Sequence, residues 1–253
     1  MDYDRIKVKS LQKAIKVLDC FVEQEGLSVT EISDKLNLYK SNVHNILATF
    51  KAMGYLEQDE ETDLYYLGAG VLRLGRALGR RFRIGKVAQP YMQALANLVE
   101  ENVFLAIPND DRAMYLDAAY PAGHIGMIRE MRGFEAPMYC TGLGKAMLAF
   151  LPEKLQEDYA SRELKAYTDN TITEKEKLME ELKRVQISGF AIDNMEHEFG
   201  VKCVAVPVLN SNGQVVAGMS ITGKASDIDW KRENEGILLK LKECVLNVQK
   251  NLI

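Results

Sequence analysis

Apolar residues recur at helical spacing three times within the first 53 residues of the chain, which predicts three helices. The first helix follows Ser10, whose hydroxyl can cap it, and ends before Gly26. The second is short and follows Ser28 or Thr30, and the third runs from about residue 40 to Gly54. Their apolar faces consist, in order, of Leu11, Ala14, Ile15, Leu18, Phe21 and Val22; of Val29, Ile32 and Leu36; and of Val43, Ile46, Leu47, Phe50 and Met53. Two short helices joined by residues 37–39 predict a helix-turn-helix at about residues 28–47.

The third helix carries a polar face opposite its apolar one. Side chains on such a face can reach bases and phosphates when the helix lies in the major groove of DNA. Asn42 and Asn45 have amides that can pair with an adenine edge, while Lys40 and Ser41 stand at the helix N-terminus, which favours a phosphate. His44 can either face DNA or pack against the second helix. The predicted DNA-binding residues are Lys40, Ser41, Asn42, His44, Asn45 and Thr49.

Residues 55–58 and 64–67 flank the acidic stretch 59–63 and predict a hairpin, the wing of a winged helix-turn-helix. Because an acidic tip is repelled by phosphate, we expect the hairpin to brace the helices or to keep its tip away from DNA. Residues 70–86 predict a linker helix with several arginines and no acidic residue, and its apolar side chains are expected to pack against a partner subunit. A basic run of this kind is either a phosphate contact or a solvated helix face. The predicted domains are therefore 1–69 and 87–253, joined by the linker helix 70–86.

The pattern after residue 86 alternates between helices and strands. A helix at 87–100 leads into strands at 103–107 and 114–118, and a second strand pair at 202–209 and 214–222 flanks the turn signal Asn212-Gly213. Helices are predicted near 144–150, at 174–187 and at 230–252, the second opened by a capping box of Thr173 and Glu176. An antiparallel sheet with helices on its faces follows, so the fold class is α+β.

Composition excludes several classes of protein. The chain has 253 residues, a net charge of −4 and 47% hydrophobic residues, which suits a folded protein and not a disordered one. No apolar run approaches the roughly 18 to 20 residues that cross a bilayer, so we expect a cytoplasmic protein without a membrane partner. The four cysteines are widely separated and predict neither disulfides nor a four-thiolate zinc site.

Candidate catalytic groups are few. Glu196-His197-Glu198 offers acid–base chemistry, but the three histidines lack metal-ligand spacing and the sequence has no Gly-x-Ser-x-Gly motif. We therefore predict that the protein is not an enzyme and uses no cofactor and no metal. A zinc ion held by His124, His197 and Cys203 is an alternative if folding brings them together. A winged helix that contacts only protein is another, against which the polar face of the third helix argues.

The segment Thr-Gly-Leu-Gly-Lys at 141–145 enters an apolar helix and is the clearest candidate for a ligand site. Glycine lets backbone N–H groups approach a ligand, and a helix N-terminus favours an anion such as a carboxylate. A tight turn that merely permits close packing is the alternative. The spacing differs from that of a nucleotide-binding P-loop.

Several segments match one family in order and in combination, although no single one would decide it: SLQKAIKVL at 10–18, LSVTEI at 27–32, KSNVH at 40–44, GYL at 54–56, YLG at 66–68, TGLGKAMLA at 141–149, GFAID at 189–193, GVKCVAVPV at 200–208 and SITG at 220–223. With these segments the chain resembles the IclR family of transcriptional regulators over nearly its whole length. Asn45 departs from the arginine that relatives usually carry there, so an operator sequence does not transfer. Residues 101–103, Glu-Asn-Val, depart from the family's Gly-Glu-Thr/Ser.

The resemblance implies a winged helix-turn-helix followed by a GAF-like α/β effector-binding domain with an antiparallel sheet. It implies a transcriptional regulator that binds a double-stranded DNA operator as a homodimer or as a tetramer formed by two dimers, and of repression and activation we favour repression. A small organic-acid or sugar-acid effector would control it, and the hydroxyl side chains favour a hydroxylated acid such as a 2-keto-3-deoxy acid. The positions that line the effector pocket in relatives are Gly142, Leu143, Asp193, Val201, Cys203, Ser220 and Thr222. Among these, Cys203 is expected to be a small buried residue and not a reactive one.

Overall fold

The structure is a computed structural model that describes residues 6–81, 83–123, 131–234 and 236–252. The chain divides into two compact units, residues 1–82 and 83–253, each with its own hydrophobic core. Helix α4 spans Gly70–Arg81 and helix α5 spans Arg83–Val99. The predicted linker helix 70–86 overlaps both of them, and residue 82 between them lies outside the described residues.

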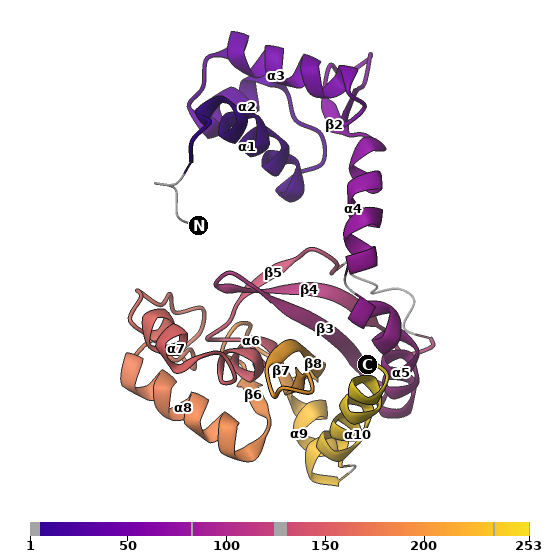
Figure 1. Cartoon of the computed structure of the whole chain (residues 1–253), viewed down its shortest axis with the longest axis vertical. Coiled ribbons are helices and arrows are strands. Elements are labelled where there is room, and N and C mark those ends of the chain that lie inside the picture. Colours follow the sequence, from indigo (N-terminus) through magenta and orange to yellow (C-terminus); the bar gives the residue numbers. More distant parts are fainter. Residues whose placement is uncertain (1–5, 82, 124–130, 235, 253) are drawn as a thin grey trace. The chain divides into compact units, whose positions relative to one another are not determined.

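The first unit is a winged helix-turn-helix (Figure 1). Helices α1 (Lys9–Glu23), α2 (Val29–Leu36) and α3 (Lys40–Ala52) are followed by the antiparallel strands β1 (Leu56–Gln58) and β2 (Tyr65–Leu67), and then by α4. The predicted helices and hairpin are thus confirmed. Its core combines all three helices with the hairpin, through Val17, Phe21, Ile32, Val43, Leu47, Leu56 and Tyr65.

Helix caps in this unit follow the prediction only in part. Ser28 caps α2 in a capping box, because its hydroxyl accepts from the Glu31 N–H while the Glu31 carboxylate accepts from the Ser28 N–H. The predicted cap Ser10 is wrong, since α1 begins at Lys9 after Val8, and none of the described side chains caps it.

The predicted apolar face of α1 is only partly buried. Val17, Cys20 and Phe21 enter the core, whereas Leu11, Ile15 and Val22 are 61%, 47% and 74% exposed. The helix therefore has apolar surface left over after its own unit has folded.

The second unit is built on a six-stranded antiparallel sheet of order β5-β4-β3-β8-β7-β6. Its strands are β3 (Asn102–Asn109), β4 (Arg112–Ala119), β5 (Glu135–Pro137), β6 (Ala191–Asn194), β7 (Val201–Leu209) and β8 (Val215–Lys224). The β7–β8 turn closes at Gly213, whose φ of 74° suits glycine, and this confirms the Asn212-Gly213 turn signal.

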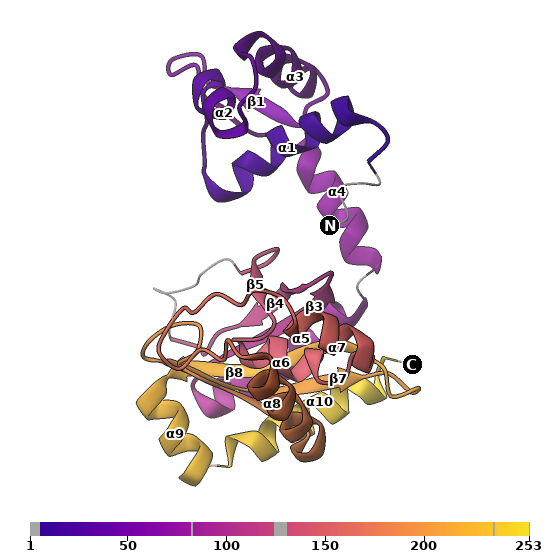
Figure 2. The ribbon, with the colours of Figure 1, turned by 90° about the vertical axis from the view of Figure 1, so that its left-hand side faces the viewer.

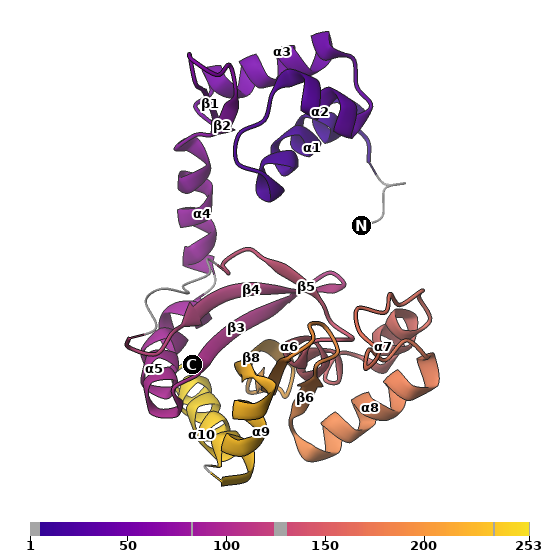
Figure 3. The ribbon, with the colours of Figure 1, turned by 180° about the vertical axis from the view of Figure 1, so that it is seen from behind.

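Helices cover both faces of this sheet. Helices α6 (Gly142–Leu148), α7 (Glu153–Ala160) and α8 (Lys175–Ser188) share one core with the alanines of β3, β6 and β7. Helices α5, α9 (Ala225–Asn234) and α10 (Ile237–Lys250) pack on the other face. Figures 2 and 3 show the two helix groups separated by the strands. Within the described residues, no helix is both long and apolar enough to cross a membrane.

Two predicted helix ends in this unit are wrong. Helix α8 begins at Lys175 with Glu174 as its cap residue, so Thr173 forms no capping box. The helix predicted at 230–252 is two helices, α9 and α10, and Gly236 between them has a φ of 63°, which a helix does not accommodate.

Candidate DNA and effector sites

The polar face of α3 is open to solvent. All six side chains predicted to bind DNA are exposed: Lys40, Ser41, Asn42, His44, Asn45 and Thr49. His44 is therefore not packed against α2. Ser41, Asn45 and Thr49 are four residues apart and so share one side of the helix. The Thr49 hydroxyl donates to the Asn45 carbonyl oxygen at 2.7 Å, which leaves it able only to accept a further hydrogen bond.

One further exposed residue lies at the N-terminus of α3. Tyr39 is the cap residue of the helix and its side chain is 81% exposed, which is unusual for so large a ring. From the sequence, Tyr39 is predicted only to lie in the turn between α2 and α3, because neither its position nor its side-chain chemistry indicates contact with DNA.

The wing holds its acidic tip in a defined turn. The Asp59 carboxylate accepts hydrogen bonds from the Thr62 N–H at 2.8 Å and the Glu61 N–H at 3.1 Å. These bonds and the Thr62 hydroxyl hold the pKa of Asp59 below its usual range. The Asp59 carboxylate therefore stays negative and is unsuited to contact phosphate.

Helix α6 starts directly against the sheet of the second unit. Thr141 caps it, since its hydroxyl accepts from the Gly144 N–H at 3.1 Å. A Cβ at Gly142 would lie 2.3 Å from Cys203 Sγ and 3.4 Å from the Asp193 nitrogen, so only glycine fits this close approach. The tight-turn interpretation of the glycines is thus correct for Gly142, whether or not the turn also binds a ligand.

The sheet register brings most of the predicted effector residues to the face beneath α6. Asp193 is paired with Cys203, and Cys203 with Thr222 on the next strand. The Ser220 and Thr222 hydroxyls lie 3.2 Å apart, with Ser220 fully buried. Val201 is half-buried at the start of β7, two residues from Cys203. Leu143 is 2% exposed and its side chain belongs to the core, so only its backbone could meet a ligand.

Asp193 is a buried carboxyl group in this cluster. It is 7% exposed, and its Oδ1 accepts from the Glu196 N–H at 2.8 Å. Burial raises the pKa of Asp193 to about 7, and the nearby Glu196 carboxylate acts in the same direction. Burial likewise raises the pKa of the Cys203 thiol to about 12, which keeps it neutral and unreactive at ordinary pH.

A series of ion pairs connects α6 with α8 and with the loop after β6. The Lys145 side chain is 1% exposed, and its ammonium contacts Glu196 and, at 3.1 Å, Glu181. Arg184 in turn binds Glu181 through two nitrogens at 2.7 Å. Burial raises the pKa of Glu196, whereas the Lys145 ammonium opposes this. The sequence indicated Lys145 only as part of the 141–145 segment and did not indicate Glu181, because Lys145, Glu181 and Glu196 are far apart along the chain.

The alternatives of catalysis and metal binding gain no support. Glu196 forms an ion pair with Lys145, and the His197 ring packs 5.0 Å from the Tyr167 ring, so both side chains make contacts within the fold. His124 lies outside the described residues. Among the residues that are described, no three His, Cys, Asp or Glu side chains could hold a metal ion.

Comparison with known proteins decides the family. Residues 10–60 match the model of the IclR helix-turn-helix domain, and residues 77–250 match that of the bacterial transcriptional regulator IclR C-terminal domain. The chain belongs to the IclR family. Its relatives are transcriptional regulators and not enzymes, so this IclR-family protein is a DNA-binding transcriptional regulator.

Individual relatives cover nearly the whole chain. The regulator BhcR of Paracoccus denitrificans is 31% identical over 97% of this chain and 86% of its own, and the repressor YiaJ of Escherichia coli is 30% identical over 90% and 81%. The IclR structure of Thermotoga maritima has a TM-score of 0.76 at 32% identity, covering 96% and 98%. An IclR homologue of Microbacterium hydrocarbonoxydans, solved with 4-hydroxybenzoate, has a TM-score of 0.83 over 96% and 98%, but at 21% identity it shows the fold alone.

Proposed function

We propose that this regulator is a repressor whose operator binding is controlled by a small carboxylic or sugar acid bound in the second unit. The acid would lie beside Gly142 and Leu143 and meet Asp193, Val201, Cys203, Ser220 and Thr222. The recognition residues would be Lys40, Ser41, Asn42, His44, Asn45 and Thr49. Two relatives support this proposal. YiaJ is named as a repressor, and the 4-hydroxybenzoate in the structure of the Microbacterium homologue is a small acid of the proposed class.

One observation carries the effector proposal: polar groups are concentrated on an otherwise apolar sheet face, directly under the α6 turn. Ser220, Thr222 and Asp193 lie among the alanines that line this face, and buried polar groups need hydrogen-bond partners. A hydroxylated acid would supply donors for Asp193 and acceptors for the two hydroxyls. Small-molecule sites are typically lined by mostly apolar side chains with a few polar groups among them.

A thermal-shift screen of the full chain against pyruvate, D-gluconate, 2-keto-3-deoxygluconate and 4-hydroxybenzoate tests this function. A ligand that binds the folded state raises the melting temperature. We expect at least one acid to raise it, and the rise to disappear in Ser220→Ala while Ser211→Ala, an exposed serine in the β7–β8 turn, keeps it. The same acid should change operator affinity by about 1 to 3 kcal/mol. Stabilisation that survives in Ser220→Ala would place the effector elsewhere.

The proposed assembly is a homodimer, paired through the first unit, or a tetramer of two such dimers. Leu72, Leu74 and Leu78 of α4 are 75%, 58% and 49% exposed, and the exposed face of α1 adds Leu11, Ile15 and Val22. Apolar faces of this size on two helices of one unit are typical of a subunit interface. Pairing would present two recognition helices to half-sites about one helical turn apart.

A further inference from the structure

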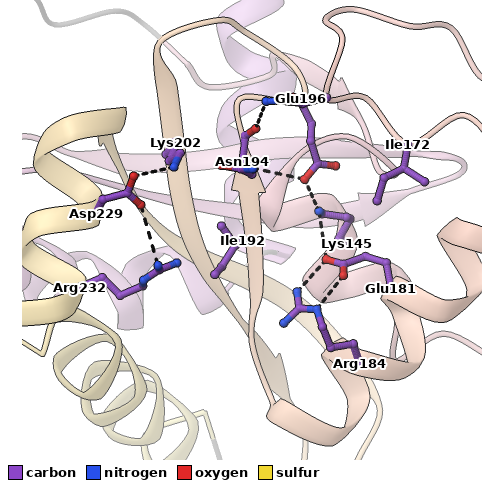
Figure 4. Close-up of a pocket in the computed structure, with 11 residues that line it drawn as sticks. Lys145, Ile172, Glu181, Arg184, Ile192, Asn194, Glu196, Lys202, Asp229 and Arg232 are labelled. Carbon is purple, nitrogen blue, oxygen red and sulfur yellow. Dashed lines mark hydrogen bonds and ion pairs between the residues drawn. The ribbon is translucent and has the colours of Figure 1, made fainter.

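A cavity of about 420 Å³ opens at the outer edge of the sheet, where β6 is the last strand (Figure 4). Helix α8 contributes Arg184 to one side, and α9 contributes Arg232 to the other. Ile192 and Asn194 of β6 line it, and along the strand they alternate with Asp193, which belongs to the proposed effector site. The cavity is therefore a different place from that site, and its volume suits a small metabolite.

A buried polar atom beside the cavity has no hydrogen-bond partner among the described residues. Glu196 is 4% exposed, and its Oε1 accepts from the Lys145 ammonium and from the Asn194 N–H. Its Oε2 is buried and meets no hydrogen-bond donor within the described part of the chain. Figure 4 shows this oxygen turned toward Ile172, which also lines the cavity. Buried carboxylate oxygens are rarely left without a donor, so a bound molecule that supplies a hydroxyl would complete the site.

The charges around the cavity favour an anion. Four cationic side chains and three carboxylates line it, a surplus of one positive charge. Arg184 donates to Glu181 through Nε and one terminal nitrogen, and its other terminal nitrogen has no acceptor among the residues that the structure describes. Arg232 stands 4.0 Å from Asp229, whose other oxygen is bound by Lys202 at 2.6 Å. Each side of the cavity therefore offers an arginine with donors to spare.

We propose that this cavity binds a small hydroxylated anion, a sugar acid or a sugar phosphate. A ligand hydroxyl donates to Glu196 Oε2, and the carboxylate or phosphate lies against Arg184 or Arg232. The Glu196 N–H donates to Asp193, and Lys145 lies three residues after Gly142, so a ligand here contacts residues directly joined to the effector site. That linkage rests on the proposed function, whereas binding in the cavity does not.

Isothermal titration calorimetry of the full chain tests the proposal with D-gluconate and D-glucose 6-phosphate, which separate the carboxylate from the phosphate source. Two control compounds each lack one feature of these ligands. D-Glucose lacks the negative charge, and inorganic phosphate lacks the sugar hydroxyls. Asn194→Trp fills the cavity, and Arg232→Gln removes the surplus charge. Asn212→Trp, in the exposed β7–β8 turn, is the matched control. Ser220→Ala reports on the effector site.

We expect one of the two anions to bind saturably, with affinity at least about tenfold lower in Asn194→Trp and in Arg232→Gln, since a lost charged contact has this order of effect. Affinity should be unchanged in Asn212→Trp and in Ser220→Ala. The proposal is overturned if neither anion binds, or if glucose or phosphate binds as tightly as the charged sugar. It is also overturned if binding survives Asn194→Trp, or if it is lost in Ser220→Ala alone, because the ligand would then occupy the effector site.

Discussion

Asp193 makes the stability of the second unit depend on pH. Its pKa is raised to about 7 by burial, so between about pH 4 and 7 the folded chain keeps a proton that the unfolded chain has lost. The free energy of unfolding therefore falls as pH rises through this window, by about 1.4 kcal/mol per pH unit from this group, and levels off above pH 7.

The measurement is urea denaturation at pH 5, 6, 7 and 8 for the unmodified chain and for Asp193→Asn. The asparagine variant cannot take up the proton, so it should gain stability relative to the unmodified chain as pH rises from 5 to 7. Asp227→Asn, on the exposed start of α9, is the control and should follow the unmodified chain. A difference that does not change with pH would mean that Asp193 is ionised throughout.

Gly142 is a second residue whose effect can be measured alone. Gly142→Ala would place a methyl group 2.3 Å from Cys203 Sγ, which forces the sulfur or α6 to move and should cost about 1–3 kcal/mol of unfolding free energy. Cys203→Ala removes the sulfur, so the double variant should lose less than the sum of the two single losses. Chemical denaturation of the four proteins gives the coupling energy, and strict additivity would show that the contact is relieved at no cost.

Among the helices and strands, α3 is the element whose side chains should determine which DNA sequence the protein recognises. Asn45→Ala should weaken operator binding by about 1–3 kcal/mol and relax the preference at one base position, because a bidentate amide contact would be lost. Lys40→Ala should weaken binding to all sequences and lower the salt dependence by about one phosphate contact. Fluorescence anisotropy with the protein's own promoter at several salt concentrations checks both, with Lys250→Ala on α10 as a charge control. Unchanged affinity in both variants would exclude α3 as the recognition helix.

Elements with a regular apolar pattern could be predicted from the sequence. The three helices and the hairpin of the first unit follow from spacing, and the β7–β8 turn follows from Asn212-Gly213. Helix ends could not be predicted as well, because Ser10 and Thr173 can cap a helix only if it starts immediately after them. Helix α1 instead starts one residue before Ser10, and α8 starts two residues after Thr173. Helix α9 likewise ends before Gly236 although the apolar pattern continues past it.

The glycine turn at 141–145 could be singled out from the sequence, but the other proposed effector residues came only from the family resemblance, because they lie on β6, β7 and β8 and meet through the register of the sheet. The Lys145 ion pairs were missed for a related reason. A lysine within an apolar helix gives no sign of burial, and its partners Glu181 and Glu196 lie 36 and 51 residues further along the chain. Long-range pairing of this kind is determined by the tertiary structure and not by local pattern.

For the whole molecule, the exposed apolar faces of α1 and α4 predict that the chain is not a monomer. Three of the six apolar residues predicted on one face of α1, Leu11, Ile15 and Val22, remain exposed when the first unit has folded. Burying one such side chain in an interface contributes about 1.5–3 kcal/mol to the free energy of association. Ile15→Glu combined with Leu74→Glu places two charges in that interface and should convert dimers to monomers. It should also lower operator affinity by more than tenfold, since a monomer contacts a single half-site.

Light scattering after size exclusion gives the mass, and anisotropy with operator DNA gives the affinity. Leu155→Glu is the matched control, because Leu155 is 51% exposed on α7 in the second unit and should not affect pairing through the first. If the double variant keeps the mass of the unmodified chain, pairing must use another surface, and the exposed apolar faces of α1 and α4 would need a different partner. If it becomes monomeric yet binds the operator undiminished, the half-sites are read independently and dimer formation cannot be the step that an effector controls.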